Sequence, residues 1–326
     1  MKKVLVLLLV VGLTFSLVAC TSDGGEEVDT SDYPSKNIEI IVAYKAGGGT
    51  DVGARILASE AEKEIGQPLV IINREGSDGE LGYTQLAQAK PDGYTIGFIN
   101  LPTFVSLTLE RDTKYGIDDV EPILNHVYDS GVVVVQSSSE LDTIEDFIEY
   151  AKKNPGDLTI ANNGTGASNH IGAAHLAHEA DIEVTHVPFG GSTDMLAALR
   201  GGHVKAAVAK ISEVAGLVDS GELKILASFT EERLENFPDV PTLAEKGYKI
   251  LFGSARALVA PKGTPKEIID YLHDKFKAAM ESTEHMEKAK NADLPIMYMG
   301  PEELGEYIKN EEVYLKEIGE ILDLTN

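Results

Sequence analysis

The sequence predicts an α/β fold in which parallel or mixed β-sheets are flanked by helices. Short β-branched segments alternate with segments of helical apolar spacing along most of the chain. Glycine-rich turns join the two kinds of segment, as is typical of strand–turn–helix units. Apolar residues make up 43% of the 326 residues, which is enough for the core of one large domain or two ordinary ones.

The N-terminal segment has the pattern of an export signal. A positively charged start precedes an almost unbroken apolar run at residues 4–19, and Cys20 follows it. The run is shorter than the roughly 20 residues that span a bilayer, so we predict a signal peptide at residues 1–19. Its Leu-Val-Ala-Cys ending resembles a lipobox and predicts lipidation of Cys20; an uncleaved anchor with a chance cysteine is the alternative. Residues 20–32 contain a single strongly apolar side chain and are predicted to be a flexible tether.

The first half of the remaining chain alternates strand, glycine turn and helix. Residues 38–43 form the first predicted strand, and apolar side chains recur at helical spacing over residues 52–65. Gly66 is placed to end this helix, because glycine readily adopts the left-handed conformation at a helix C-terminus. Two further strands are predicted at residues 69–73 and 94–99.

The second half has the same architecture without a detectable sequence repeat. Ser168 and Ser192 are the predicted N-caps of two helices that follow glycine turns. The predicted strands are residues 157–161, 183–188 and 204–209.

Two segments are predicted to cross between the halves. Consecutive valines within residues 131–136 indicate a buried strand, and a second crossover is expected near residues 251–260. A capping box at residues 264–267 starts a helix that runs to about residue 280. This helix and a final one at residues 302–322 are expected to pack on the first half.

Three glycine turns that each precede a predicted helix are the main chemical feature. They occupy residues 45–51, 163–170 and 189–194. A helix N-terminus presents backbone N–H groups without intrahelical partners and a partial positive charge, and glycine lets a ligand approach them. We therefore predict that these turns bind a carboxylate or phosphate at the carboxyl ends of the strands.

The charge balance excludes some classes of protein but not an anion site. The chain has 28 Lys and Arg against 53 Asp and Glu, a net charge of −25, which argues strongly against nucleic-acid binding. Exposed charges are screened beyond about 8 Å, whereas backbone amides act on a ligand at about 3 Å. The single cysteine excludes an intrachain disulfide.

Enzyme and metal motifs are incomplete in this sequence. It has no phosphate-binding P-loop, no nucleophile elbow and only part of a dinucleotide fingerprint. Of His170, His175 and His178, only the last two would share a helix face, so a metal site is disfavoured. Asp51 and Asp194 are first-turn acids, which stabilise a helix by about 0.3–1 kcal/mol, and this explains them better than catalysis does. No catalytic residue, metal or cofactor is predicted; an exported enzyme acting on an organic acid is the less favoured alternative.

Several segments in order along the chain resemble one protein family. They include Ala46-Gly47-Gly48-Gly49-Thr50-Asp51, Pro91-Asp92-Gly93-Tyr94-Thr95, Gly164-Thr165-Gly166-Ala167-Ser168-Asn169-His170, His186-Val187-Pro188-Phe189-Gly190-Gly191-Ser192, Pro238-Asp239-Val240-Pro241-Thr242-Leu243 and Pro261-Lys262-Gly263-Thr264-Pro265. The chain resembles the substrate-binding proteins of tripartite tricarboxylate transporters, the Bug family, over essentially the whole predicted domain.

The resemblance implies a two-lobed, periplasmic-binding-protein-like fold with the ligand in the cleft between the lobes. It implies a monomeric, extracytoplasmic lipoprotein that captures a small di- or tricarboxylate and delivers it to membrane permease subunits. A ligand-sensing protein of a signalling system is the alternative. Combined with the crossovers, it predicts lobe 1 at residues 33–131 and 254–326 and lobe 2 at residues 132–253.

The resemblance also places ligand contacts on the three turns. The residues are Ala46, Gly48, Gly49, Thr50 and Asp51 in the first turn, Asn163, Gly164, Thr165, Gly166, Ser168 and His170 in the second, and Phe189, Gly190, Gly191, Ser192, Thr193 and Asp194 in the third.

Two basic residues depart from the pattern of many relatives. Where those have Asp-Asn after a strand, this chain has Ala209 and Lys210, which argues for an acidic ligand rather than an amino acid. Arg256 occupies a position that often holds an aromatic residue. Lys210 and Arg256 are candidates to pair additional ligand carboxylates; the alternatives are a surface lysine and a structural ion pair at the hinge.

Overall fold

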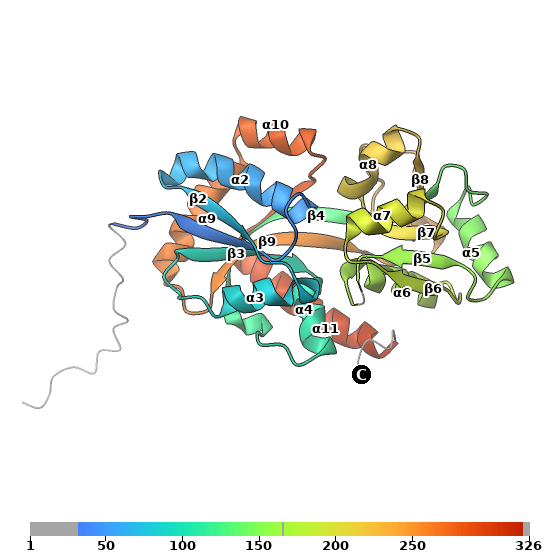
Figure 1. Ribbon diagram of the computed structural model, residues 1–326, viewed down its shortest axis with the longest axis horizontal. Coiled ribbons are helices and arrows are strands. Elements are labelled where there is room, and N and C mark those ends of the chain that lie inside the picture. The colour runs from blue at the N-terminus through green and yellow to red at the C-terminus, as the bar shows by residue number, and fades with distance from the viewer. Residues whose placement is uncertain (1–31, 165, 322–326) are drawn as a thin grey trace, which may run out of the picture. The chain divides into compact units, whose positions relative to one another are not determined.

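Two β-sheets that share one long strand organise the protein, shown as a computed structural model in Figure 1. The structure describes residues 32–164 and 166–321. The predicted signal peptide, Cys20, nearly all of the predicted tether and Thr165 lie outside these residues.

The first sheet has the strand order β2-β1-β3-β9-β4, and β10 pairs with the same β4. Strands β1, β2 and β3 are mutually parallel, whereas β9 runs antiparallel to both β3 and β4. The bounds are β1 (Ile38–Val42), β2 (Leu69–Asn73), β3 (Thr95–Leu101), β4 (Val120–Gln136), β9 (Gly253–Pro261) and β10 (Ile296–Met299).

The second sheet is built on the other end of β4, which pairs with β7 and β8. Strand β5 lies parallel to β6 and β7, so this sheet is also mixed. The bounds are β5 (Thr159–Asn162), β6 (Thr185–Pro188), β7 (Ala206–Lys210) and β8 (Leu223–Ser228). The predicted mixed α/β class is therefore confirmed.

The shared strand β4 is much longer than the sequence indicated. The prediction covered residues 131–136, but β4 has 17 residues, and its first part pairs with β9. The change of partner falls at Gly131, which is opposite Lys210 of β7, whereas Ser130 is opposite Gly253 of β9. The prediction missed the first part because polar residues interrupt its apolar pattern.

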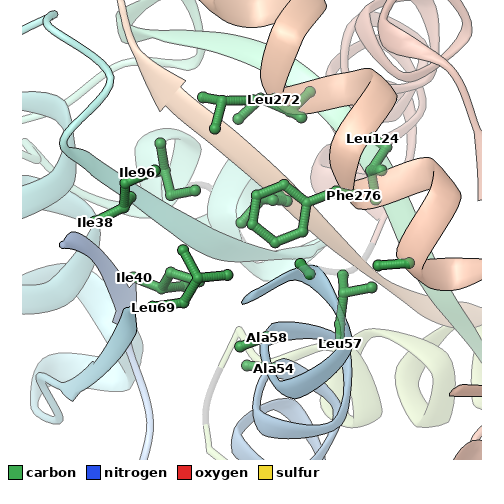
Figure 2. Packing of buried hydrophobic residues seen from close by; sticks show 14 of the residues in the cluster. Ile38, Ile40, Ala54, Leu57, Ala58, Leu69, Ile96, Leu124, Leu272 and Phe276 are labelled. Atoms are coloured by element: carbon green, nitrogen blue, oxygen red, sulfur yellow. The ribbon is translucent and has the colours of Figure 1, made fainter. Parts of the chain in front are cut away.

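Helices cover both faces of each sheet. Helices α2 and α9 pack on one face of the first sheet, where Phe276, Leu57 and Ile40 belong to one buried cluster (Figure 2). Helices α3, α4 and α11 pack on its other face. On the second sheet, α5 and α6 share one buried cluster and α7 and α8 another. The bounds are α2 (Gly49–Ile65), α3 (Glu80–Ala87), α4 (Thr103–Glu110), α5 (Ile144–Lys153), α6 (Ser168–Glu179), α7 (Ser192–Arg200), α8 (Ile211–Asp219), α9 (Lys266–Met280), α10 (Thr283–Asn291) and α11 (Pro301–Ile321).

The predicted side-chain caps of three helices are wrong by one residue. The N-cap positions are Ala167 for α6, Gly191 for α7 and Pro265 for α9, and none of them makes a side-chain cap hydrogen bond. Ser192 instead donates its hydroxyl hydrogen to Glu213 on α8. The first turns of α6 and α7 therefore keep backbone donors that a serine cap would have used.

Candidate functional site

The three predicted turns follow β1, β5 and β6 and begin α2, α6 and α7. Their N-cap residues are Gly48, Ala167 and Gly191, and none provides a side-chain acceptor to the helix. The first residues of each helix have N–H groups beyond the reach of intrahelical carbonyls. Each turn therefore presents donors suited to an anion.

Some amides within the turns are already bonded. Gly47 N donates to Asp51 Oδ2 at 2.8 Å, and Gly164 N donates to Asn162 Oδ1 at 3.2 Å. Gly166 N donates to His170 Nδ1 at 3.2 Å. These three amides therefore stabilise the turns and are not available to a ligand, whereas the other backbone N–H groups of the turns remain candidates for ligand binding.

Asp51 is a buried support for the first turn. Its carboxylate accepts hydrogen bonds from Gly47 N, from Arg55 Nε at 3.0 Å and from Asn73 Nδ2 at 2.9 Å. Burial acts to raise the pKa of Asp51, but these hydrogen bonds, led by that from Arg55, lower it overall. The carboxylate is therefore ionised at neutral pH and stabilises the turn.

His170 is a neutral acceptor in the second turn. Its ring lies edge-to-face with His186 at 4.7 Å between centroids. Burial, with a smaller contribution from His186, lowers the pKa of His170 to about 4. The ring is therefore uncharged at pH 7, consistent with Nδ1 accepting from Gly166.

Thr50 connects the first turn to the strands beneath it. Its hydroxyl and the side-chain amide of Asn100 approach to 2.8 Å. Asn100 on β3 lies opposite Arg256 on β9. Residues opposite each other in an antiparallel pair project to the same face, so Asn100 and Arg256 both lie on the face that carries the N-terminus of α2. No local sequence signal pointed to Asn100.

Arg256 is enclosed against the first turn. It is 4% exposed, and its Nη2 lies 2.5 Å from Asp129 Oδ2. A Cβ on Gly49 would lie 2.8 Å from Nη2, so glycine is required for this close approach. Nε and Nη1 have no hydrogen-bond partner within the described residues. The ion pair predicted as an alternative therefore exists, and it leaves guanidinium donors free.

Asp129 joins this cluster to the second sheet. The side chain is fully buried on β4 and accepts hydrogen bonds from Ser212 N at 3.1 Å and from the Ser212 hydroxyl. Together with the Arg256 pair, these contacts tie β9 to the start of α8. Asp129 was not predicted from the sequence, although an acid three positions before a run of buried valines requires a partner.

Lys210 is not a surface lysine. It is the last residue of β7, is 3% exposed, and has its Nζ 3.6 Å from the centroid of the Phe252 ring. No hydrogen-bond partner for Nζ is present among the described residues. Burial, with a smaller contribution from Arg256, lowers the pKa of Lys210 to about 7 against the opposing effects of Glu213 and Asp129.

The third turn contacts this cluster through Glu213. One carboxylate oxygen of Glu213 accepts from the Ser192 hydroxyl, and the other accepts from Lys210 N at 2.9 Å. The first and third turns are therefore linked through Arg256 on β9, Asp129 on β4 and the start of α8.

Two acids outside the predicted site lie against the second turn. Asp78 Oδ1 would be 3.0 Å from a Cβ on Gly164, and Glu110 Oε1 occupies the space that a Cβ on Gly166 would need. Burial raises the pKa of Glu110 to about 7. Ser106 on the same helix donates its hydroxyl hydrogen to Gly166 O at 2.9 Å. The second turn thus contacts α4.

The described chain offers little support for other kinds of site. Residues 32–164 and 166–321 contain no group of three His, Cys, Asp or Glu placed to hold a metal ion. In the same ranges, no helix combines the length and apolar character needed to cross a bilayer. A separate surface hollow of about 520 Å³ is lined by residues such as Tyr150, Asn154 and Lys205, and none of the three turns contributes to it.

Two mixed sheets that share strand β4, with glycine turns at the strand ends, define an α/β solute-binding protein of the periplasmic-binding-protein type. Residues 53–324 match the family described as the tripartite tricarboxylate transporter family receptor. The chain belongs to this family, as its resemblance predicted.

Curated relatives agree over most of the chain. The UPF0065 protein in the gbd 5′ region of Cupriavidus necator is 34% identical over 300 residues, 90% of each chain. Protein BugT of Bordetella pertussis is 33% identical over 260 residues, which cover 78% of this chain and 79% of BugT.

Solved structures have the same fold. The periplasmic binding protein BugD matches with a TM-score of 0.82 and 28% identity over 90% of this chain and 99% of BugD. MatC from Rhodopseudomonas palustris with bound malate matches with a TM-score of 0.80 and 25% identity over 88% and 99%. Another R. palustris protein, with adipate, matches with a TM-score of 0.83 and 25% identity over 90% and 99%.

Proposed function

We propose that the protein captures a small di- or tricarboxylate in the cleft between two lobes, without catalysis. The observation that carries this proposal is the pair of buried basic side chains with unsatisfied donors, Lys210 and Arg256, next to helix N-termini that lack side-chain caps. Buried cations favour an anionic partner, because an unpaired buried charge is costly. The malate and adipate bound by two similar structures support this ligand class.

The proposed lobes are those derived from the sequence, residues 33–131 with 254–326 and residues 132–253. Closure would follow from a ligand that contacts both lobes only in the closed form, which shifts a pre-existing equilibrium. Arg256 lies beside Gly49 and would bind the ligand carboxylate at the first turn. Lys210, whose backbone N–H bonds Glu213, would bind the carboxylate at the third turn. A dianion that bridges the two turns satisfies both cations.

The proposed ligand contacts keep the predicted set, with roles refined by the geometry. Gly49, Thr50, Lys210 and Arg256 are the contacts that the structure supports most directly. The other proposed residues are Ala46, Gly48, Asp51, Asn163, Gly164, Thr165, Gly166, Ser168, His170, Phe189, Gly190, Gly191, Ser192, Thr193 and Asp194.

Isothermal titration calorimetry and thermal melting with malate, adipate and citrate test this proposal. A ligand that binds the native state raises the melting temperature, by an amount set by its concentration relative to Kd. The amides of the same acids are the matched control, since they keep the shape and remove the charge. Flat melting curves for the whole carboxylate panel would refute the proposed ligand class.

We also propose that the protein is an extracytoplasmic lipoprotein, anchored through Cys20, which delivers its ligand to the permease subunits of a tripartite tricarboxylate transporter. Membership of the receptor family and the lipobox-like sequence support this role. Mass spectrometry of the mature N-terminus should find cleavage before Cys20 and the added lipid. The Cys20→Ala variant should lose the membrane fraction, and an unchanged distribution would contradict the anchor.

A further inference from the structure

The ammonium group of Lys210 lacks the hydrogen bonds that such a group normally makes. Its side chain is 3% exposed, and its Nζ has no acceptor within the described residues. The Phe252 ring, 3.6 Å away, offers its face to the cation. A desolvated cation–π contact offsets only part of the cost of burying an ammonium.

Charged groups face Lys210 from three packed elements, and other donors already engage both acids. Asp129 on β4 accepts from Arg256 and Ser212. Glu213 on α8 accepts from the Ser192 hydroxyl and from the backbone N–H of Lys210, not from Nζ. Arg256 on β9 adds a like charge. The surroundings therefore attract a proton to Nζ only weakly.

The ligand-free amine consequently titrates close to neutrality. Burial lowers its pKa to about 7, and a carboxylate placed against Nζ would act in the opposite direction. The added acceptor favours the charged form, so the pKa of the bound state moves back toward the ordinary lysine value of about 10.4. Between these two values, the bound protein carries more protons than the free protein.

We propose that Lys210 takes up a proton when a di- or tricarboxylate enters the cleft, so that ligand capture is coupled to proton binding. This inference rests on the proposed function and adds the protonation state of the site to it. Affinity is then highest below the free pKa and weakens as the pH rises through the interval between the two pKa values. The loss approaches tenfold in Kd per pH unit when one proton is coupled.

Isothermal titration calorimetry of the full chain in detergent, with malate, adipate and citrate, measures this coupling. Binding enthalpies at pH 8.0 in HEPES and in Tris differ by the number of protons taken up multiplied by the difference between the ionisation enthalpies of the two buffers. All three ligands are fully ionised at this pH and release no protons. We expect an uptake of between about half a proton and one proton per ligand bound, and weaker binding at pH 9 than at pH 7.

Lys210→Met and Lys205→Met form a matched pair for this experiment. Lys205 immediately precedes β7, but its Nζ lies 3.6 Å from Asp157 on the surface. Proton uptake should vanish in Lys210→Met, together with part of the affinity, and persist in Lys205→Met. Binding without proton uptake in the wild-type protein would overturn the inference and leave the proposed function intact, and so would uptake that persists in Lys210→Met. No binding of any probe would overturn both.

Discussion

Replacing Gly49 with alanine tests the contact between the first turn and Arg256. An added Cβ would lie 2.8 Å from Nη2, 2.9 Å from Nη1 and 3.0 Å from Cζ. Ordinary contact begins at 3.4 Å, so the guanidinium must retreat by about 0.6 Å, from 2.8 to 3.4 Å. The tip of Arg256 is buried and held by Asp129, so the displacement acts on the ion pair and on the free donors.

The expected cost falls on ligand binding more than on stability. Alanine should favour the first helical turn by about 0.5–1 kcal/mol relative to glycine. Overpacking costs about 1–3 kcal/mol, so the free energy of unfolding should fall by at most about 2.5 kcal/mol. A lost charge-assisted hydrogen bond removes about 1.5–3 kcal/mol of binding. The Kd for malate, adipate or citrate should therefore rise roughly 10- to 150-fold.

Gly216→Ala is the control for this substitution. Gly216 is a helical glycine of α8, and no atom lies within 4 Å of a Cβ built there. Calorimetry should give its wild-type Kd, and urea unfolding should show unchanged or slightly raised stability. Wild-type affinity in Gly49→Ala, or equal losses in both variants, would refute the proposed role of the first turn.

Two further predictions concern buried polar pairs. Asp129→Ala leaves the Arg256 charge unpaired and should lower the free energy of unfolding by about 3–5 kcal/mol in urea titrations; a change below about 1 kcal/mol would show that the pair is not buried in solution. His126 and His285 share a buried Nε2–Nε2 hydrogen bond of 2.8 Å, and burial lowers both pKa values. The unfolded chain therefore binds protons at a higher pH than the folded protein does. The contribution of the pair to the free energy of unfolding is present above the ordinary histidine pKa of about 6.5. It is lost below that pH, by up to about 1.4 kcal/mol per pH unit for each histidine. Unfolding free energies at pH 7.5 and 5.5 should show the loss in the wild-type protein and a smaller one when both histidines are leucine.

Local sequence signals predicted the elements that carry the turns. The strand at Ile38–Val42, the helix at Gly49–Ile65 and its end at Gly66 follow from β-branched content, helical periodicity and the left-handed glycine, which act over a few residues. The predicted serine caps were wrong because capping depends on side-chain direction. Ser192 faces Glu213, which is distant in sequence.

Strand pairing between segments far apart in the chain could not be predicted from local sequence patterns. The full length of β4 depends on β9, whose residues follow more than a hundred positions later. A similar reason explains why three residues near the turns were not predicted. Each of them contacts a residue of another element of the fold: Asn100, Asp129 and Glu110. Only for Asp129 did the sequence offer a signal, because an acid within a buried strand requires a partner.

The sequence by itself determined the α/β class, the family and the glycine turns, because periodicity, turn chemistry and ordered motifs reside in short stretches of chain. Tertiary structure alone decided that Lys210 is enclosed, that Arg256 pairs with Asp129, and that Glu110 lies against the second turn. Burial and charge pairing depend on which segments fold against one another. The electrostatics around Lys210 and Arg256 therefore depend on the pairing of β4 with β9 and β7.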